Sequence, residues 1–163
     1  YLEPQGKANP KAIKSIEESE YIVIGPGDLY TSIIPVLLVN DVKNAMKKSK
    51  AKIIYIMNLM TKSGQTTNYK ASDHVKDLVK YLGREPDYIL INNGIIASKV
   101  LSSYERYNEV KVINDLNKNG YQIIEKDLVD VKKIEKNSAD ILYRSILRHD
   151  SEKVAKTLVS IFK

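Results

Sequence analysis

Cysteine is absent from the 163 residues, which excludes disulfide bonds, zinc ribbons and a thiol nucleophile. Histidine occurs only as His74 and His149, which have no evident partner ligands, so we expect no metal centre. No signal peptide and no long apolar run is visible, and the longest such run, 33–39, contains Pro35. We therefore expect a protein of the reducing cytoplasm with no membrane partner.

Arginine is scarce, with four residues against 22 lysines in a net charge of +6. Base readout and bidentate phosphate binding favour arginine. The positive charge is therefore interpreted as a lysine-solubilised surface, and nucleic acid is not an expected partner.

The apolar pattern alternates short strands with amphipathic helices. Continuously apolar strands separated by helices are typical of parallel pairing with both sheet faces buried. The pattern predicts one α/β domain over 1–163, with a doubly wound, Rossmann-like three-layer αβα fold and a mostly parallel sheet. Strands are expected at 21–24, 52–57, 88–91 and 121–124, and helices at 10–19, 33–39, 72–82, 98–107 and 150–162. A further helix, capped by Asn40 and Asp41, is expected to carry Val42, Ala45 and Met46.

Three polar, glycine-containing stretches follow predicted strands: 25–32, 58–73 and 92–94. In open α/β sheets the loops after the carboxyl ends of the strands carry the ligand. The first stretch contains Gly25 and Gly27, which allow a close backbone approach, and Thr31 or Ser32 could cap the next helix at an anion site. A plain strand-to-helix turn explains it equally, and Asp28 favours that alternative because its charge repels phosphate.

The second stretch is dense in hydroxyls and amides, which can read a base or a sugar but also occur in any solvated loop. Its length favours a function, because structureless loops this long are uncommon. Aromatic stacking surface near these loops is limited to Tyr30 and Tyr69.

Three strings carry a family resemblance: IGPGDLYTSIIPVLL, NLMTKSGQTTNYKASDHV and LRHDSEKVAKTL. They resemble the C-terminal half of the bacterial gluconeogenesis factors, which bind uridine-diphosphate sugars and are related to the 2-phospho-L-lactate transferases. The resemblance implies a ligand site at the loops identified above. With the third polar stretch, the candidate ligand-binding residues are Gly25, Pro26, Gly27, Asp28, Leu29, Tyr30, Thr31, Ser32, Asn58, Leu59, Met60, Thr61, Gly64, Gln65, Thr66, Asp73, His74, Asn92, Asn93, Gly94 and Arg148.

The chain departs from the usual family strings at several positions. Asp28 replaces a serine, Lys62 and Ser63 replace Gln-Pro, and Gln65 replaces a glutamate. The family also begins with a strand and a glycine-rich turn that these residues do not contain. An incomplete sheet exposes an apolar edge, so we expect association with an N-terminal half or with a second copy.

The resemblance implies a nucleotide-sugar-binding regulator of carbon metabolism and of cell shape and cell wall. The alternative is a transferase moving a phospholactyl-type group from a nucleotide diphosphate carrier to a deazaflavin, with magnesium. A second alternative is an interaction domain that binds no ligand. The sequence assigns no catalytic residue.

Overall fold

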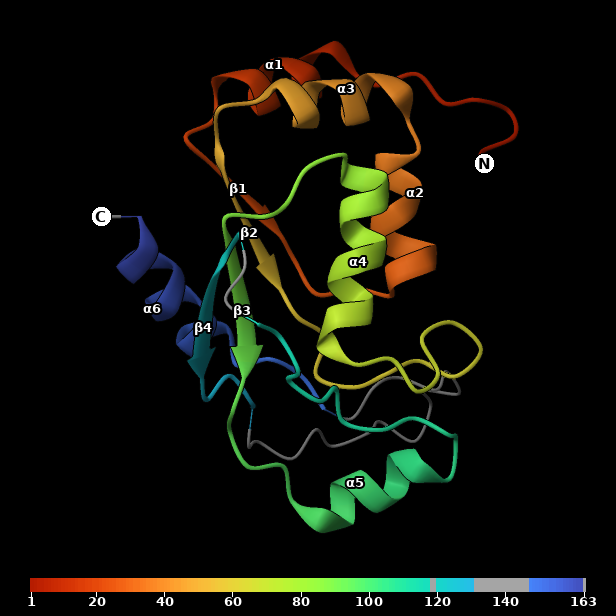
Figure 1. Ribbon diagram of the computed structural model, residues 1–163, viewed down its shortest axis with the longest axis vertical. Helices are drawn as coiled ribbons and strands as arrows, with labels where there is room; N and C mark the ends of the chain where they lie inside the picture. The colour runs from red at the N-terminus through yellow and green to blue at the C-terminus, as the bar shows by residue number, and fades with distance from the viewer. Residues whose placement is uncertain (118–119, 131–146, 163) are drawn as a thin grey trace, which may run out of the picture.

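The computed structural model describes residues 1–117, 120–130 and 147–162, and a parallel sheet of four strands lies at its centre (Figure 1). Adjacent strands pair in register, with Val23 opposite Ile54 and Ile89 opposite Ile123. In spatial order the strands are β1 (Tyr21–Ile24), β2 (Lys52–Ile56), β3 (Tyr88–Asn92) and β4 (Gln122–Lys126).

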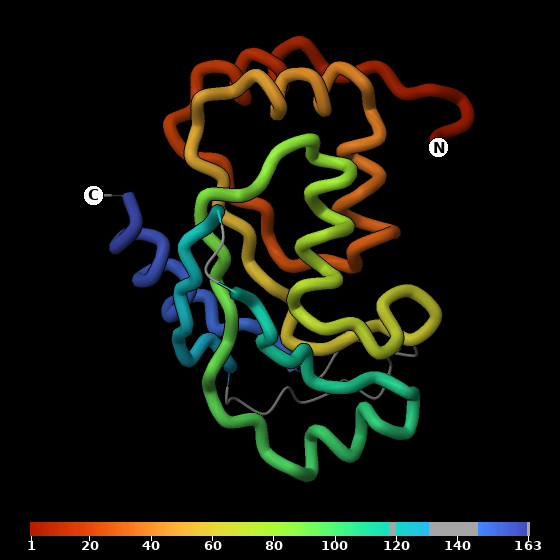
Figure 2. The backbone as a smooth tube through the Cα atoms, viewed as in Figure 1, coloured from red at the N-terminus to blue at the C-terminus, as the bar shows by residue number. Residues whose placement is uncertain are grey.

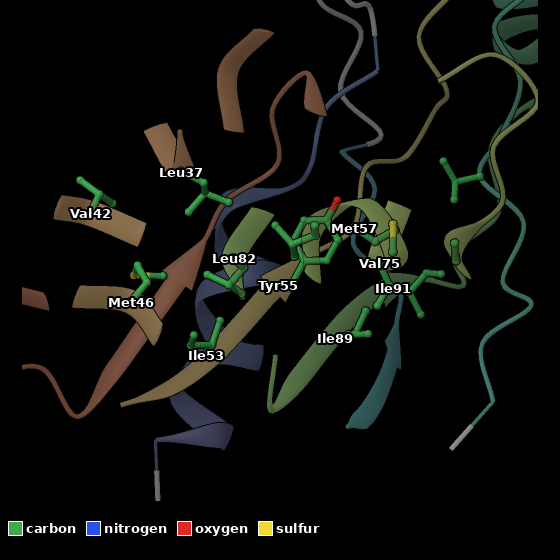
Figure 3. Packing of buried hydrophobic residues seen from close by; sticks show 13 residues of the cluster. Leu37, Val42, Met46, Ile53, Tyr55, Met57, Val75, Leu82, Ile89 and Ile91 are labelled. Atoms are coloured by element: carbon green, nitrogen blue, oxygen red, sulfur yellow. The ribbon is translucent and has the colours of Figure 1, made fainter. Parts of the chain in front are cut away.

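Helices cover both faces of this sheet, which confirms the predicted three-layer αβα architecture (Figure 1). The larger core joins one face to the helices α2, α3 and α4, with Tyr55 and Ile89 at its centre (Figure 3). On the other face Ile54 and Leu90 pack against α6. The helices are α1 (Pro10–Glu18), α2 (Ile34–Leu37), α3 (Asn40–Lys48), α4 (Ala71–Leu82), α5 (Ser98–Glu105) and α6 (Ser151–Ile161).

The described strands follow one another across the sheet in chain order. The reversal of strand order that a doubly wound sheet contains therefore does not lie between any two of them. The carboxyl ends of β1, β2 and β3 all point toward the end of the molecule where α5 lies (Figure 1).

Local signals explain where several helices begin and end. The Asn9 side chain accepts a hydrogen bond from the Lys11 amide, with Pro10 as the first residue of α1. Gly83 ends α4 with a φ of 83°, the left-handed conformation that glycine adopts without strain. Asp150 caps α6 by accepting from the amides of Glu152 and Lys153. These three boundaries agree with those predicted from the sequence.

Two predicted boundaries were wrong. The helix expected at 33–39 begins earlier, because a π-helical turn, η1 (Leu29–Ile33), precedes α2 and buries Leu29 in the protein. The helix α3 takes Val39 as its N-cap, so Asn40 and Asp41 already lie inside its first turn.

The two edges of the described sheet differ in character. The β4 edge carries exposed Glu125 and Lys126, whereas β1 is wholly apolar and leaves Val23 40% exposed. Charged residues on an edge strand discourage pairing with another strand. Only β1 therefore has the features of an unprotected edge. Among the described residues, no helix has the length and apolar character needed to span a bilayer.

Candidate functional site

A cavity of about 350 Å³ opens at the carboxyl end of the sheet. Its walls come from the turn after β1, the loop after β2, the end of α5 and the segment before α6, which lie together at one end of the backbone (Figure 2). The lining residues are Pro26, Gly27, Asp28, Asn58, Leu59, Met60, Thr61, Lys62, Tyr104, Glu109, Leu147, Arg148 and His149. Parts of all three strings that carry the family resemblance thus line one cavity.

The turn after β1 places Gly27 and Asp28 on the cavity wall. Neither Gly25 nor Gly27 needs a positive φ, so the turn does not depend on the left-handed conformation. The expected cap by Thr31 or Ser32 is not found. Both residues lie inside η1, and the amide of Ser32 donates to the carbonyl of Asp28 at 2.8 Å.

Asn58 connects this turn to the loop after β2. Its Nδ2 donates to the carbonyl oxygen of Gly27 at 2.9 Å, which fixes the side-chain amide. Its Oδ1 is buried and has no hydrogen-bond partner among the described residues. Because this oxygen is almost inaccessible to solvent, it lies behind the surface of the cavity wall.

The hydroxyls of two threonines in this loop, Thr61 and Thr66, accept hydrogen bonds from backbone amides of the protein. Thr61 Oγ1 accepts from the Val110 amide at 2.9 Å, and Thr66 Oγ1 accepts from the Lys62 amide at 2.8 Å. Met60 and Lys111 form an antiparallel bridge beside them. Of the predicted residues, Thr66 and Gly64 lie outside the cavity lining, whereas Met60 and Thr61 are part of it.

Tyr30 and Tyr69 are tied to α4 instead of offering stacking surface. Both hydroxyls donate to Asp77 Oδ2, and they lie 3.1 Å from each other. Burial, followed by the hydrogen bond to Asp77, raises the pKa of Tyr30 far above its ordinary value. The aromatic ring that lines the cavity belongs to Tyr104, whose hydroxyl accepts from the Leu147 amide at 2.8 Å.

Gln65 reaches the turn at a different point. Its Nε2 donates to Thr31 Oγ1 at 3.4 Å, while its Oε1 is buried without a partner in the described part of the chain. Asp73 and His74 lie behind the loop, away from the cavity lining. Asp73 Oδ2 accepts from the Lys70 amide, and His74 is fully buried edge-on to Tyr69. Burial lowers the pKa of His74.

The stretch 92–94 joins strands and does not line the cavity. Asn92 Oδ1 accepts from the amides of Gly94 and Leu128, and the amide of Asn93 donates to Lys126. A Cβ at Gly94 would lie 2.2 Å from a carboxylate oxygen of Asp127. This stretch connects the end of β3 to the chain after β4.

The segment before α6 contributes Arg148 and His149. Arg148 is exposed, and its guanidinium has no partner among the described residues. The His149 ring hydrogen-bonds the backbone of Met57, while its Nε2 is buried and has no partner in the same part of the chain. Burial outweighs that hydrogen bond and lowers the pKa of His149.

Sequence reasoning missed a buried ion pair on the cavity wall. Lys62 Nζ lies 3.0 Å from Glu109 Oε1, and the Glu109 side chain is only 5% exposed. The departure from the family string at Lys62 was a signal, whereas Glu109 and Tyr104 stand in no motif. Within the described ranges, no group of three or more histidine, aspartate or glutamate side chains could hold a metal ion.

Comparisons with known proteins agree on one family. The profile described as 2-phospho-L-lactate transferase CofD matches residues 1–129. The gluconeogenesis factor of Bacillus subtilis is 37% identical over 94% of this chain and 46% of its own length. A relative in Clostridium acetobutylicum is 37% identical over 98% of this chain and 34% of its own. A crystal structure from Bacillus halodurans, of the UPF0052 family, superposes with a TM-score of 0.83 at 32% identity over 98% of this chain and 49% of that one. The chain thus spans between a third and a half of these relatives.

Proposed function

Because the chain belongs to the 2-phospho-L-lactate transferase CofD family, which includes the gluconeogenesis factors it matches, we propose that its cavity binds a nucleoside-diphosphate sugar. The proposal rests on one observation: residues 26–28, 58–62 and 147–149 line a single cavity although they are far apart in the chain. A volume of about 350 Å³ lies within the range of small-molecule sites.

Different groups on the cavity wall suit different parts of the ligand. Arg148 presents an exposed guanidinium at the cavity that has no partner in the described part of the chain, and arginine binds phosphate oxygens in a bidentate manner. The partly exposed side chain of Met60 supplies apolar surface for a base, whereas Leu59 and Tyr104 on the same lining are buried. The diphosphate would lie at Arg148.

We assign the protein a regulatory role of the gluconeogenesis-factor type, acting on carbon metabolism and on cell shape and cell wall. One acidic side chain of the cavity lining, Glu109, is buried and already forms an ion pair with Lys62. It is therefore poorly placed to exchange protons with a substrate. The Bacillus subtilis relative is named a gluconeogenesis factor.

The alternative, a phospholactyl transferase, is favoured by the family description and by Asp28. Magnesium is often held by one carboxylate together with substrate phosphates. Asp28 lines the cavity and its carboxylate has no partner among the described residues, so it could hold the ion in this way. Magnesium there would neutralise charge on a transferred group.

We further propose that β1 pairs with a strand from the portion of the relatives that this chain does not span. The β1 edge has no charged residue and leaves Val23 40% exposed, whereas β4 is protected by Glu125 and Lys126. The chain spans 49% of the superposed crystal structure, so a further segment of comparable size is available as the occupant.

Calorimetric titration tests the ligand. The protein is titrated with UDP-glucose and with GDP, each with and without magnesium. Preference for UDP-glucose without metal supports the regulator, and magnesium-dependent GDP binding supports the transferase. No heat in any arm, from a protein with a normal unfolding transition, would overturn both.

A pair of variants tests whether the diphosphate binds at Arg148. Arg148→Ala should weaken UDP-glucose binding by about tenfold or more, because it removes a charge-assisted contact. Arg106→Ala removes an equally exposed arginine outside the cavity lining and should leave binding unchanged. Equal losses in both variants would show that only net charge matters.

A further inference from the structure

One side of α6 presents apolar side chains to solvent. Ala155, Val159 and Phe162 are exposed, with 60% of Val159 and 43% of Phe162 accessible. Their spacing of four and then three residues places them on one stripe of the helix. The residues with which α6 packs on the sheet lie on a neighbouring stripe: Val154, Leu158 and Ile161. The apolar surface of α6 is therefore wider than the part that the described sheet covers.

Contacts at the two sides of α6 show which way this stripe faces. The ring of Phe162 lies 4.7 Å, between centroids, from the ring of Tyr21, the first residue of β1. On the other side, Lys153 Nζ donates to Asp127, just after β4, at 2.7 Å. Lys156, 81% exposed, lies beyond Lys153 and extends the polar side. The exposed apolar stripe thus faces β1, and the polar side faces β4.

The strand β1 continues the same apolar surface. Val23 pairs with Ile54 in the parallel register, so both side chains point to the α6 face of the sheet. Ile54 is fully buried beneath α6, whereas Val23 is 40% exposed. Tyr21, two residues before Val23, points to this face as well. We call the continuous set the α6–β1 surface: Tyr21, Val23, Ala155, Val159 and Phe162.

A second helix beside α6 has the dimensions to cover this surface. Packed helices lie about 8–10 Å apart, and neighbouring strands are separated by about 4.8 Å. A helix next to α6 would therefore lie over β1 and over one strand beyond it. Parallel sheets are covered by helices on both faces, and within the described ranges α6 alone packs on this one.

The connections between strands indicate how such a helix would be attached. Right-handed crossovers put their helices on one face when the strands step in one direction, and on the opposite face when they step back. The steps from β1 to β2 and from β2 to β3 carry α2, α3 and α4 over the larger core. A helix on the α6 face therefore connects strands that step away from β1 on its outer side.

We infer that an amphipathic helix docks on the α6–β1 surface, and that it comes from the portion of the relatives that this chain does not span. This inference rests on the proposed pairing of β1, and it does not depend on the identity of the ligand. The chain covers 49% of the superposed crystal structure, so that portion is long enough to supply both a strand and a helix.

The docked helix also locates the reversal of strand order, which falls at the outer edge of β1. Ligands of doubly wound sheets bind in the crevice at the carboxyl ends of the strands where the order reverses. The turn after β1 borders this crevice and lines the cavity with Gly27 and Asp28. The docked portion would therefore supply the wall of the ligand site that lies beyond β1.

Cysteine labelling of the full-length protein tests the docking, because these 163 residues contain no cysteine. Ala155→Cys and Val159→Cys each place a thiol on the α6–β1 surface, and Lys156→Cys is the control on the polar side of the same helix. Mass spectrometry measures how fast a maleimide modifies each peptide. Both surface thiols should react about tenfold or more slowly than the control thiol.

A photo-crosslink identifies what covers the surface. With p-benzoylphenylalanine in place of Val159, illumination should join α6 to a peptide outside these 163 residues and of the same polypeptide. Labelling of all three thiols at equal rates would overturn the docking. A crosslink to a second copy, with protection that disappears as the protein is diluted, would overturn the assigned occupant.

Hydrogen exchange and calorimetry separate this inference from the other proposals. Slow exchange of the β1 amides that do not bond to β2, together with reactive surface thiols, would retain the pairing of β1 and overturn the docked helix. Protected thiols in a protein that gives no heat with UDP-glucose or GDP would support the docked helix and overturn the proposed ligand.

Discussion

Replacing Tyr55 with phenylalanine should stabilise the protein. Tyr55 lies on β2 in the centre of the larger core, fully buried, and its hydroxyl has no partner among the described residues (Figure 3). Burying an unpaired hydroxyl costs about 1–3 kcal/mol in protein mutational data. The space left by one oxygen, roughly 10 Å³, costs only about 0.2 kcal/mol. We therefore expect Tyr55→Phe to raise the free energy of unfolding by about 1 kcal/mol.

The difference should grow at alkaline pH. Burial raises the pKa of Tyr55 in the folded state, whereas the unfolded chain ionises near the ordinary value of about 10. A raised folded pKa means that stability is complete below the unfolded pKa of about 10 and falls as pH rises from there through the folded pKa. Phenylalanine has no such loss, so the gap should widen by up to about 1.4 kcal/mol for each pH unit above about 10.

Urea denaturation at pH 7.5 and pH 11 measures both effects. Tyr104→Phe is the matched control, because it deletes the same oxygen from a buried ring whose hydroxyl accepts from the Leu147 amide. The control should lose about 1 kcal/mol at pH 7.5. A comparable loss in Tyr55→Phe, with no widening at pH 11, would refute the argument by showing that the Tyr55 hydroxyl is paired.

Three further predictions concern the turn and the sheet. Gly27→Val should leave the fold intact, since a Cβ would meet only side-chain atoms, Ser32 Cβ at 3.3 Å and Ile33 Cγ1 at 3.7 Å. It should lower ligand affinity more than tenfold by filling the cavity wall; equal affinity would make the loop purely structural. Asp77→Asn should lower the urea midpoint and weaken ligand binding, because it removes the charge that anchors Tyr30; an unchanged midpoint contradicts this. Burial alone would raise the pKa of Asp87, but its bonds from Lys52 and the Ile53 amide lower it, so its stabilisation is present above about pH 4 and lost in acid. Asp87→Asn should therefore cost about 1–2 kcal/mol at pH 7 and little at pH 3 in denaturation curves.

The sheet was largely predictable because its strands are almost uninterrupted apolar runs. The residues 53–56 and 89–91 are buried on both faces, as a parallel strand between two helical layers requires. The helix α4 was equally clear, with Val75, Leu78 and Leu82 recurring on one face before Gly83. The early start at Leu29 was not predictable, since it depends on burial of that side chain by segments distant in sequence.

The candidate site was predictable only where residues stand in a motif. Asn58 and Arg148 belong to quoted strings, and both line the cavity. Tyr104 in the last turn of α5 and Glu109 just after this helix line it as well, in a stretch with no recognisable pattern. Asn92 was selected for following a strand, yet its amide is used between β3 and the chain after β4. Position at the carboxyl edge is therefore necessary for a site residue but does not say whether its polar group is free.

The strand order β1-β2-β3-β4 also bears on how the chain assembles. During synthesis each strand after β1, as it emerges, finds a pairing partner already made. The helices α2, α3 and α4 are complete before β3 appears, so the larger core can form on the growing sheet. Only the opposite face stays uncovered until α6 is released, which leaves Ile54 and Leu90 exposed on the nascent chain until translation reaches residue 161.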